Sequence, residues 1–254
     1  MSGKLFLVPT PLDFGVDAEG APPDLQEVLP LGLIRIAARL EHWVVENAKT
    51  TRAFLKRVNA VVPLALPLQA LQIVELPRPQ KGAKVQGAAG LDALLGPALQ
   101  GHDIGLVSEA GLPAVADPGA ALVLTAHAVG IEVIALSGPS ALLLALAASG
   151  LNGQSFAFVG YLPVEAAERH ARIRELEAHS KRLAQTQLMI ETPYRNEALL
   201  GALLAGLSPG TRLSVSCGLT LDGGWTRTDS VAAWKAKPAQ IPKDVPAVFS
   251  LLAG

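Results

Sequence analysis

The sequence predicts an α/β fold in which a parallel sheet is covered on both faces by helices. Short apolar runs alternate with longer stretches whose apolar residues recur three and four positions apart, which is the rhythm of βαβ units. Half of the 254 residues are hydrophobic and 17% are charged, which supports a sizeable core and excludes a disordered chain. Aromatic residues make up only 4%, so Leu, Ala and Val must fill the interior. The length allows two modest domains or one large one.

Each expected element follows from its local pattern, the strands from short apolar runs and the helices from apolar periodicity. In the first half the expected strands are Lys4–Pro9, His42–Glu46, Leu71–Leu76, Ile104–Val107 and Ile131–Leu136, and the expected helices are Leu29–Leu40, Lys49–Val58, part of Lys81–Gly101, and Pro118–Gly130. In the second half the expected strands are Phe156–Pro163, Thr186–Pro193, Arg212–Thr220 and Pro246–Gly254, and the expected helices are Gly138–Gly150, Val164–Gln185, Asn196–Leu207 and Ser230–Lys237. The polar segment Leu12–Asp24 is expected to be a long, mobile loop.

Composition excludes several classes of protein. The net charge of −1 gives no global electrostatic reason to bind nucleic acid, which leaves only a local basic patch for that purpose. The single cysteine, Cys217, excludes an intramolecular disulfide framework, and the five histidines lack metal-ligand spacing, so no metal is expected. The apolar stretch Ile134–Leu151 is broken by Gly138 and Pro139, which favours a strand, a turn and a buried helix over a membrane span. The N-terminus resembles neither a signal peptide nor a membrane span, so the expected location is the cytoplasm.

The segment Ser108–Gly119 (SEAGLPAVADPG) follows a buried strand and combines two acids, two prolines and two glycines. Ligands of open α/β sheets bind outside the carboxyl ends of the strands, where this segment lies. Glycine lets the backbone approach a ligand closely and proline holds the loop rigid. Glu109 and Asp117 offer acceptors to hydroxyl or amino groups. The alternative for Asp117 is an ordinary helix N-cap, with Pro118 at the first helical position.

Five strand ends share this chemistry of proline, glycine and small polar residues. They are Val8–Pro11, Val45–Asn47, Ser108–Gly119, Ser137–Ser140 and Ile190–Arg195. One such end would be ordinary turn chemistry, whereas five predict a shared cleft. The chain has no G-x-G-x-x-G, Walker loop or H-E-x-x-H motif, so none of those sites competes with this prediction.

These same stretches resemble the tetrapyrrole methylase superfamily, the class III S-adenosylmethionine (SAM)-dependent methyltransferases. Within it the chain looks most like the bacterial 16S rRNA cytidine 2′-O-ribose methyltransferases. LFLVPTP is similar to the opening strand of that subfamily, and VSEAGLPAVADPG to its VSDAGTPxxSDPG signature. LSGPSALLLALAASGL and FAFVGYLP resemble PGxSAxxxALxxSGL and FxFxGFLP, LMIETPYR resembles an ESPHR-type strand end, and SCGLT resembles RELTK. The matches run through most of the chain in the right order.

The resemblance implies two α/β domains, residues 1–137 and 138–254, each built on a mostly parallel or mixed sheet. It further implies that SAM binds in the cleft between the domains and that the protein is a homodimer. By position, the implied SAM contacts are Pro9, Ser108, Glu109, Ala110, Gly111, Leu112, Pro113, Ser140, Ala141, Ile190 and Leu219. Small residues at these positions are consistent with contacts made largely by the backbone.

The sequence departs from the subfamily pattern mainly on the acceptor side. The motif PTPIGNLxD is PTPLDFGVD here, which removes a Gly-Asn step. The motif EDTRxT becomes Glu46–Thr51, in which Asn47 replaces the aspartate and Lys49 replaces the arginine. The segment after FLP, PVEAAERHAR, is less cationic. The cofactor side of the pattern is kept better than the acceptor side.

Methyl transfer requires in-line approach of the acceptor, so much of its acceleration comes from holding donor and acceptor in that line. A ribose hydroxyl also needs a base, for which Glu46, Glu109 and Glu191 are the candidates, with a solvated or capping role as the alternative for each. The expected catalytic set is Glu46, Lys49 and Glu191.

The predicted function is SAM-dependent methylation of an RNA ribose 2′-hydroxyl of the 16S rRNA type, or of a related small polar acceptor, and rRNA in the 30S subunit is a candidate substrate. Lys49, Arg52 and Arg195 are candidates for holding a phosphate or carboxylate, and otherwise belong to solvated surfaces. The first alternative is methylation of a tetrapyrrole precursor, whose many carboxylates would need several convergent cations. The second alternative is a protein that binds SAM, or only a partner protein, without catalysis.

Overall fold

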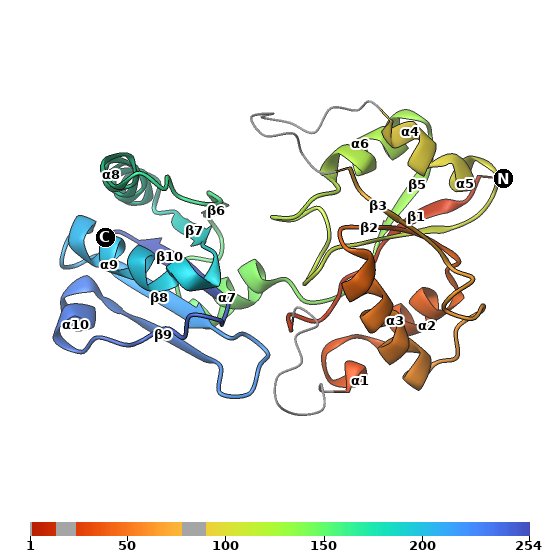
Figure 1. Cartoon of the computed structure of the whole chain (residues 1–254). Helices are drawn as coiled ribbons and strands as arrows, with labels where there is room; N and C mark the ends of the chain where they lie inside the picture. Colours follow the sequence, from red (N-terminus) through yellow and green to blue (C-terminus); the bar gives the residue numbers. More distant parts are fainter. Residues whose placement is uncertain (1, 14–23, 78–89) are drawn as a thin grey trace. The chain divides into compact units, whose positions relative to one another are not determined.

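The computed structural model describes residues 2–13, 24–77 and 90–254, and the chain forms two compact units, Met1–Ser140 and Ala141–Gly254 (Figure 1). Most of the expected loop Leu12–Asp24 lies outside the described residues, as does the start of Lys81–Gly101. None of the described helices combines the length and apolarity that a membrane crossing needs.

The first unit contains a five-stranded sheet with the order β3-β2-β4-β1-β5, in which every pair of neighbours is parallel. Its strands are β1 (Lys4–Leu7), β2 (His42–Val45), β3 (Gln72–Glu75), β4 (Ile104–Val107) and β5 (Glu132–Ala135). Its described helices are α1 (Leu25–Val28), α2 (Leu31–Arg39), α3 (Ala48–Val61), α4 (Leu91–Leu94), α5 (Gly96–Leu99) and α6 (Ala120–Ala128).

Alternate side chains of each strand enter two different cores, as the pleat requires. Phe6, Trp43 and Val107 pack against α1, α2 and α3. Leu5 and Leu106, their neighbours along the strands, pack against α4, α5 and α6. Helices therefore cover both faces of this parallel sheet, as Figure 1 shows.

The second unit contains a mixed five-stranded sheet with the order β6-β7-β10-β8-β9, in which β6 and β7 are parallel and the other pairs are antiparallel. Its strands are β6 (Phe156–Phe158), β7 (Thr186–Ile190), β8 (Arg212–Cys217), β9 (Trp225–Ser230) and β10 (Ala247–Leu252). Its helices are α7 (Ala141–Ser149), α8 (Ala166–Leu183), α9 (Asn196–Gly206) and α10 (Val231–Ala236), and a 3₁₀ turn spans Pro193–Arg195.

Helices also cover both faces of the second sheet. Buried residues of α8, α9 and α10 form one core with Met189 and Phe249. The other face carries α7, whose Leu146 packs on Leu188 and Val248. The expected α/β class is confirmed, with one sheet parallel and one mixed.

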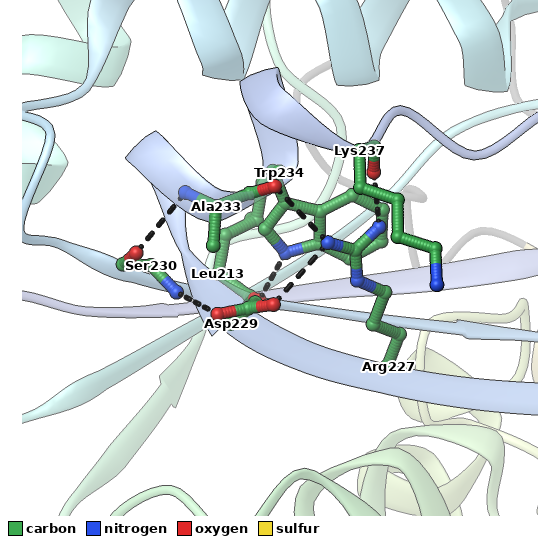
Figure 2. A network of polar contacts seen from close by, with 7 residues as sticks. All are labelled: Leu213, Arg227, Asp229, Ser230, Ala233, Trp234 and Lys237. Atoms are coloured by element: carbon green, nitrogen blue, oxygen red, sulfur yellow. Dashed lines mark hydrogen bonds and ion pairs between the residues drawn. The ribbon is translucent and has the colours of Figure 1, made fainter.

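Arg227 of β9 lies at the centre of a polar network that fixes α10 to the sheet (Figure 2). Its guanidinium stacks over the ring of Trp234, 4.1 Å from the centroid. It also donates hydrogen bonds to the carboxylate of Asp229 and to the backbone carbonyls of Ala233 and Lys237. The indole N–H of Trp234 donates to a backbone carbonyl of β8 over 2.8 Å. The carbonyl of Lys237, and that of Ala233, which also accepts the N–H of Lys237, thus find a donor on the neighbouring strand.

The structure contains two elements that the apolar periodicity did not predict, α1 and β9. It also divides one predicted helix into two. The short helix α1 begins after Asp24, whose carboxylate accepts a hydrogen bond from the N–H of Gln26. The strand β9 was not expected, because its sequence WTRTDS lacks an apolar run. Within Lys81–Gly101 the described helix divides into α4 and α5, since Pro97 has no N–H to continue α4.

Candidate functional site

The candidate site of the first unit is the edge where β1 and β4 end side by side. The chain leaves β1 for α2 on one face of the sheet and leaves β4 for α6 on the other face. Such a reversal of winding opens a crevice at the carboxyl ends of the two strands. Pro9 and Ser108, both buried, lie at this switch point, as the sequence predicted for strand ends.

Two backbone hydrogen bonds join the loops that follow β1 and β4. The N–H of Thr10 donates to the carbonyl of Gly111 over 3.0 Å, and the N–H of Gly111 donates back to the carbonyl of Thr10 over 3.1 Å. The loop after β5 joins them, because a Cβ on Gly138 would lie 2.4 Å from Cβ of Pro9. Three of the five predicted strand ends therefore meet at one place, and the hydrogen bond from the N–H of Glu109 to Glu46 adds a fourth, Val45–Asn47.

The loop Ser108–Gly119 has an unusual backbone. Gly111 and Gly119 have φ values of 79° and 126°, and the two alanines Ala114 and Ala116 both have φ of 66°. Alanine in this left-handed region is strained, and such strain persists only where the surroundings fix it. The loop is therefore held in one shape, with Ala110 and Leu112 half-buried and Pro113 buried within it.

Three carboxylates gather at the same edge. Glu46, at the end of β2, accepts a hydrogen bond of 3.0 Å from the backbone N–H of Glu109. Burial raises the pKa of Glu46 above its usual range; the Glu109 N–H partly offsets this, and the Glu109 charge adds to it. Burial, followed by the charge of Glu46, raises the pKa of Asp117 to about 6, although the hydroxyl of Ser108 lowers it in part.

The N-cap alternative for Asp117 is wrong. Helix α6 begins at Ala120 with Gly119 as its N-cap, and no side chain caps it. Because Gly119 takes a φ of 126°, the helix starts two residues later than a cap at Asp117 would allow. Asp117 instead lies near enough to Glu46 and Glu109 for their charges to raise its pKa, after burial, the main cause.

The start of α3 explains how the chain accommodates Asn47 where the subfamily motif has an aspartate. The side chain of Asn47 accepts hydrogen bonds from the N–H groups of Lys49 and Thr50, so it caps the helix as an aspartate would. Lys49 and Arg52 are exposed on the first turns of α3, one turn beyond Glu46. Their exposure suits binding of a phosphate or a carboxylate and equally suits a solvated helix face.

The predicted cofactor residues of the second unit also meet. Ala141, Ile190 and Leu219 are partly buried and pack against one apolar cluster that contains Leu146 and Val248. These residues come from the start of α7, the end of β7 and the loop after β8. Ser140 directly precedes them, as the last residue of the first unit.

Hydroxyl groups line the sheet beneath α7. Thr228 Oγ1 lies 2.8 Å from the Ser149 carbonyl and 2.8 Å from Ser214 Oγ, and Thr226 Oγ1 lies 2.9 Å from Ser216 Oγ. These pairs satisfy buried polar groups and fasten the end of α7 to β8 and β9. The α7 side of the second sheet is thus fixed by both apolar and polar contacts.

Glu191, the third expected catalytic residue, is part of an ion pair. Its Oε1 accepts hydrogen bonds from Arg195 Nη2 over 2.6 Å and from the N–H of Thr192 over 2.7 Å. The bond with Glu191 is the main reason that the pKa of Arg195 is raised. A carboxylate held in this way positions Arg195, which makes Glu191 a weaker candidate for a base than Glu46.

Sequence patterns missed two features of these edges. The close approach of Gly138 to Pro9 has a signal in hindsight, because a glycine beside Pro139 after a strand marks tight contact. The placing of Tyr161 near Arg195 has no such signal, since it depends on the pairing of β6 with β7. Within residues 2–13, 24–77 and 90–254, no group of three His, Cys, Asp or Glu side chains could hold a metal ion.

No protein-family model matches the chain. It is similar to proteins named Ribosomal RNA small subunit methyltransferase I. The one from Mycobacterium bovis is 33% identical over 224 residues, or 85% of this chain and 66% of that protein. The one from Halalkalibacterium halodurans is 39% identical over 202 residues, or 80% of this chain and 60% of that protein. The one from Mesorhizobium japonicum is 39% identical over 137 residues, or 54% of this chain and 45% of that protein. Each match thus spans less than two thirds of the relative's length.

Solved structures share the fold. The uroporphyrin-III-C-methyltransferase from Thermus thermophilus has a TM-score of 0.53 and 20% identity, and the comparison covers 99% of this chain and 93% of that chain. A putative cobalamin synthesis related protein (CobF) from Corynebacterium diphtheriae has a TM-score of 0.59 and 14% identity, with 99% of both chains covered. Sequence relatives and fold agree with the motifs at the strand ends: the chain is similar in sequence to proteins named Ribosomal RNA small subunit methyltransferase I, and it shares its fold with solved structures such as the uroporphyrin-III-C-methyltransferase.

Proposed function

We propose that the chain is a SAM-dependent methyltransferase that methylates small-subunit ribosomal RNA at a ribose 2′-hydroxyl. The observation that carries the proposal is the structure of the loops at the carboxyl ends of β1 and β4. There the Thr10–Gly111 hydrogen bonds hold a strained loop beside Glu46 and Asp117. The names of the sequence relatives support ribosomal RNA as the substrate. The resemblance of the strand-end motifs supports the ribose hydroxyl as the acceptor.

The residues at this edge fit SAM, which carries a sulfonium, an ammonium, ribose hydroxyls and an adenine amine. Carboxylates suit all of these groups, as acceptors of hydrogen bonds or as partners of positive charge. Glu109 and Asp117 lie on the loop itself, and Gly111 lets its backbone approach a ligand. In the second unit, Ala141, Ile190 and Leu219 supply an apolar patch of the kind that an adenine ring prefers.

The bound cofactor would supply an electrophilic methyl carbon on a positively charged sulfur. The chain's own residues orient the acceptor and take its proton. Glu46 is the candidate base, because its raised pKa makes it a better proton acceptor than an ordinary carboxylate. Lys49 is a candidate to hold an RNA phosphate, since it is exposed on the turn of α3 that follows Glu46.

The cofactor and the acceptor need separate tests. Calorimetry with SAM and with its demethylated product should detect binding of both, and a protein without affinity for either would contradict the proposal. Radiolabelled SAM should transfer its methyl group to 30S subunits that lack the modification, and alkaline digestion should leave the labelled ribose resistant. Label on a uroporphyrinogen instead would favour the tetrapyrrole alternative, and SAM binding without transfer to either would favour the non-catalytic one.

A matched pair of substitutions tests the placement of the site. Ala110→Trp fills the half-buried loop at the edge and should abolish SAM binding, whereas Ala128→Trp, at the exposed end of α6, should leave it unchanged. Equal affinity in both variants would contradict the placement. We also propose a cytoplasmic homodimer, as the resemblance implies, and sedimentation of the pure protein at the mass of one chain would contradict the dimer.

A further inference from the structure

Two exposed tyrosines and an arginine gather where β6 and β7 end. Tyr161 follows Gly160, whose φ of 72° turns the chain after β6. The N–H of Ile190 donates to the carbonyl of Gly160 over 3.2 Å, which holds the ends of the two strands together. Tyr161 is 56% exposed and Tyr194 is 69% exposed, so neither side chain is buried in the core.

Arg195 is fixed against its own strand end, beside Tyr194. Its Nη2 and Nε donate to Glu191 Oε1 and to Thr192 Oγ1, at 2.6 and 3.3 Å. Its guanidinium carbon lies 5.9 Å from the centroid of the Tyr194 ring, within the range of a cation–π contact. Both tyrosines add to the raised pKa of Arg195, which places Tyr161 within reach of its charge.

The fixed guanidinium keeps donors for a ligand. Among the described residues, Nη1 of Arg195 has no hydrogen-bond partner, while Nε and Nη2 are occupied. A planar cation that is oriented by a carboxylate and still has free N–H groups is suited to phosphate oxygens. An exposed apolar patch alone would carry no such charge, so the cluster favours an anionic ligand with flat, apolar parts.

We propose that Tyr161, Tyr194 and Arg195 bind an unpaired nucleobase and its phosphate in the RNA substrate. The rings stack on bases, and Arg195 holds the backbone beside them. Bases in single-stranded RNA expose faces that stack on aromatic side chains without regard to sequence. The proposal rests on the proposed function for the identity of the RNA, and it assigns these residues to acceptor recognition rather than to SAM.

The test measures binding of a fluorescent oligouridine by anisotropy at fixed salt. Tyr194→Leu should weaken binding about fivefold or more, the loss of one stacked base, whereas Tyr194→Phe should bind like the parent protein. Tyr161→Leu should behave like Tyr194→Leu. Phe156→Leu is the matched control, because Phe156 is 42% exposed at the opposite end of β6 and should have no effect.

A second probe separates stacking from charge. An abasic oligonucleotide of the same length has the phosphates without the bases, so Tyr194→Leu should not change its affinity, while Arg195→Lys should weaken both probes. Equal affinities of the parent, Tyr194→Leu and Tyr161→Leu proteins for oligouridine would overturn the proposal. So would a loss in Phe156→Leu as large as in these variants.

The nucleobase site and the proposed function can be contradicted separately. Methyl transfer to 30S subunits by the Tyr194→Leu protein with an unchanged KM would overturn the nucleobase site and leave the function intact. Stacking-dependent binding of oligouridine without any transfer of methyl groups by the parent protein would support the site and contradict the function. SAM affinity, measured by calorimetry, should be the same in all of these variants.

Discussion

The Oε2 atom of Glu46, at the end of β2, accepts a hydrogen bond of 3.0 Å from the backbone N–H of Glu109, the second residue beyond β4. This bond joins two neighbouring strand ends and draws the loop toward a carboxylate. Because the backbone bond offsets only part of the effect of burial, the pKa of Glu46 stays above its ordinary value. Glu46 therefore has two separable roles, holding the loop and keeping a basic oxygen at the edge.

Glu46→Gln separates these roles. The amide oxygen of glutamine can still accept from Glu109, so SAM affinity should be retained. Methyl transfer should fall about 10²- to 10⁴-fold, the range for loss of a general base. Glu75→Gln is the control, because Glu75 Oε1 also accepts a backbone N–H, that of Ala48 at 2.8 Å, at the neighbouring strand end. Single-turnover rates that fall equally in both variants would show that Glu46 has no special chemical role.

Asp117 should make stability depend on pH. Its pKa rises from 3.8 to about 6 on folding, so between these values the folded state binds more protons than the unfolded state. Its contribution is present below about pH 4 and is lost as the pH rises through about 6. Asp117→Asn should remove this dependence and gain about 1–2 kcal/mol near neutral pH, a range discounted for partial exposure. Urea unfolding across this range would measure it, with exposed Asp244→Asn as the control.

Gly138→Ala should disturb the contact between the loops after β1 and β5. The new Cβ would lie 2.4 and 2.6 Å from two ring carbons of Pro9, so the backbone must shift. A cost of about 1–3 kcal/mol is expected from such overpacking, together with weaker binding of SAM. Gly32→Ala, in α2 with open space around it, should instead stabilise by about 0.5–1 kcal/mol. Thermal unfolding of the two variants should shift in opposite directions.

Arg227→Lys should loosen α10. Lysine keeps the charge but cannot stack as a plane on Trp234 while donating to the carbonyls of Ala233 and Lys237 (Figure 2). A loss of about 1–2 kcal/mol in the free energy of unfolding is expected from one cation–π contact and the hydrogen bonds. Arg212→Lys, on the exposed start of β8, should be neutral in the same denaturant titration. A neutral Arg227→Lys protein would show that the network contributes no net stability.

The sequence predicts most of this fold because apolar periodicity and burial agree in most elements. The run Ile104–Val107 is buried at every position in β4, and helix α7 buries Leu142, Ala145, Leu146 and Ser149 at the spacing of one helix face. The strand β9 was missed because its hydrogen bonds to β8, and no apolar pattern of its own, make it a strand. Pairing partners of this kind are tertiary information that a local pattern does not contain.

The candidate site was predictable only in the part that depends on local sequence. Proline and glycine at the strand ends identified the loops correctly, since turn chemistry is local. The role of Asp117 was open, because both a cap and a buried acceptor fit the sequence Asp-Pro-Gly. In the structure Gly119 takes a φ of 126° and is itself the N-cap of α6, so Asp117 does not cap this helix.

The reciprocal bonds between Thr10 and Gly111 join segments that are distant along the chain. Contacts of this kind require closure of a long loop and form after local structure. The two amides should therefore exchange with deuterium together, and only when the parallel sheet opens as a whole. We therefore expect the strained loop to take its shape only when the first unit is assembled, so that a ligand that needs this shape would report on that assembly.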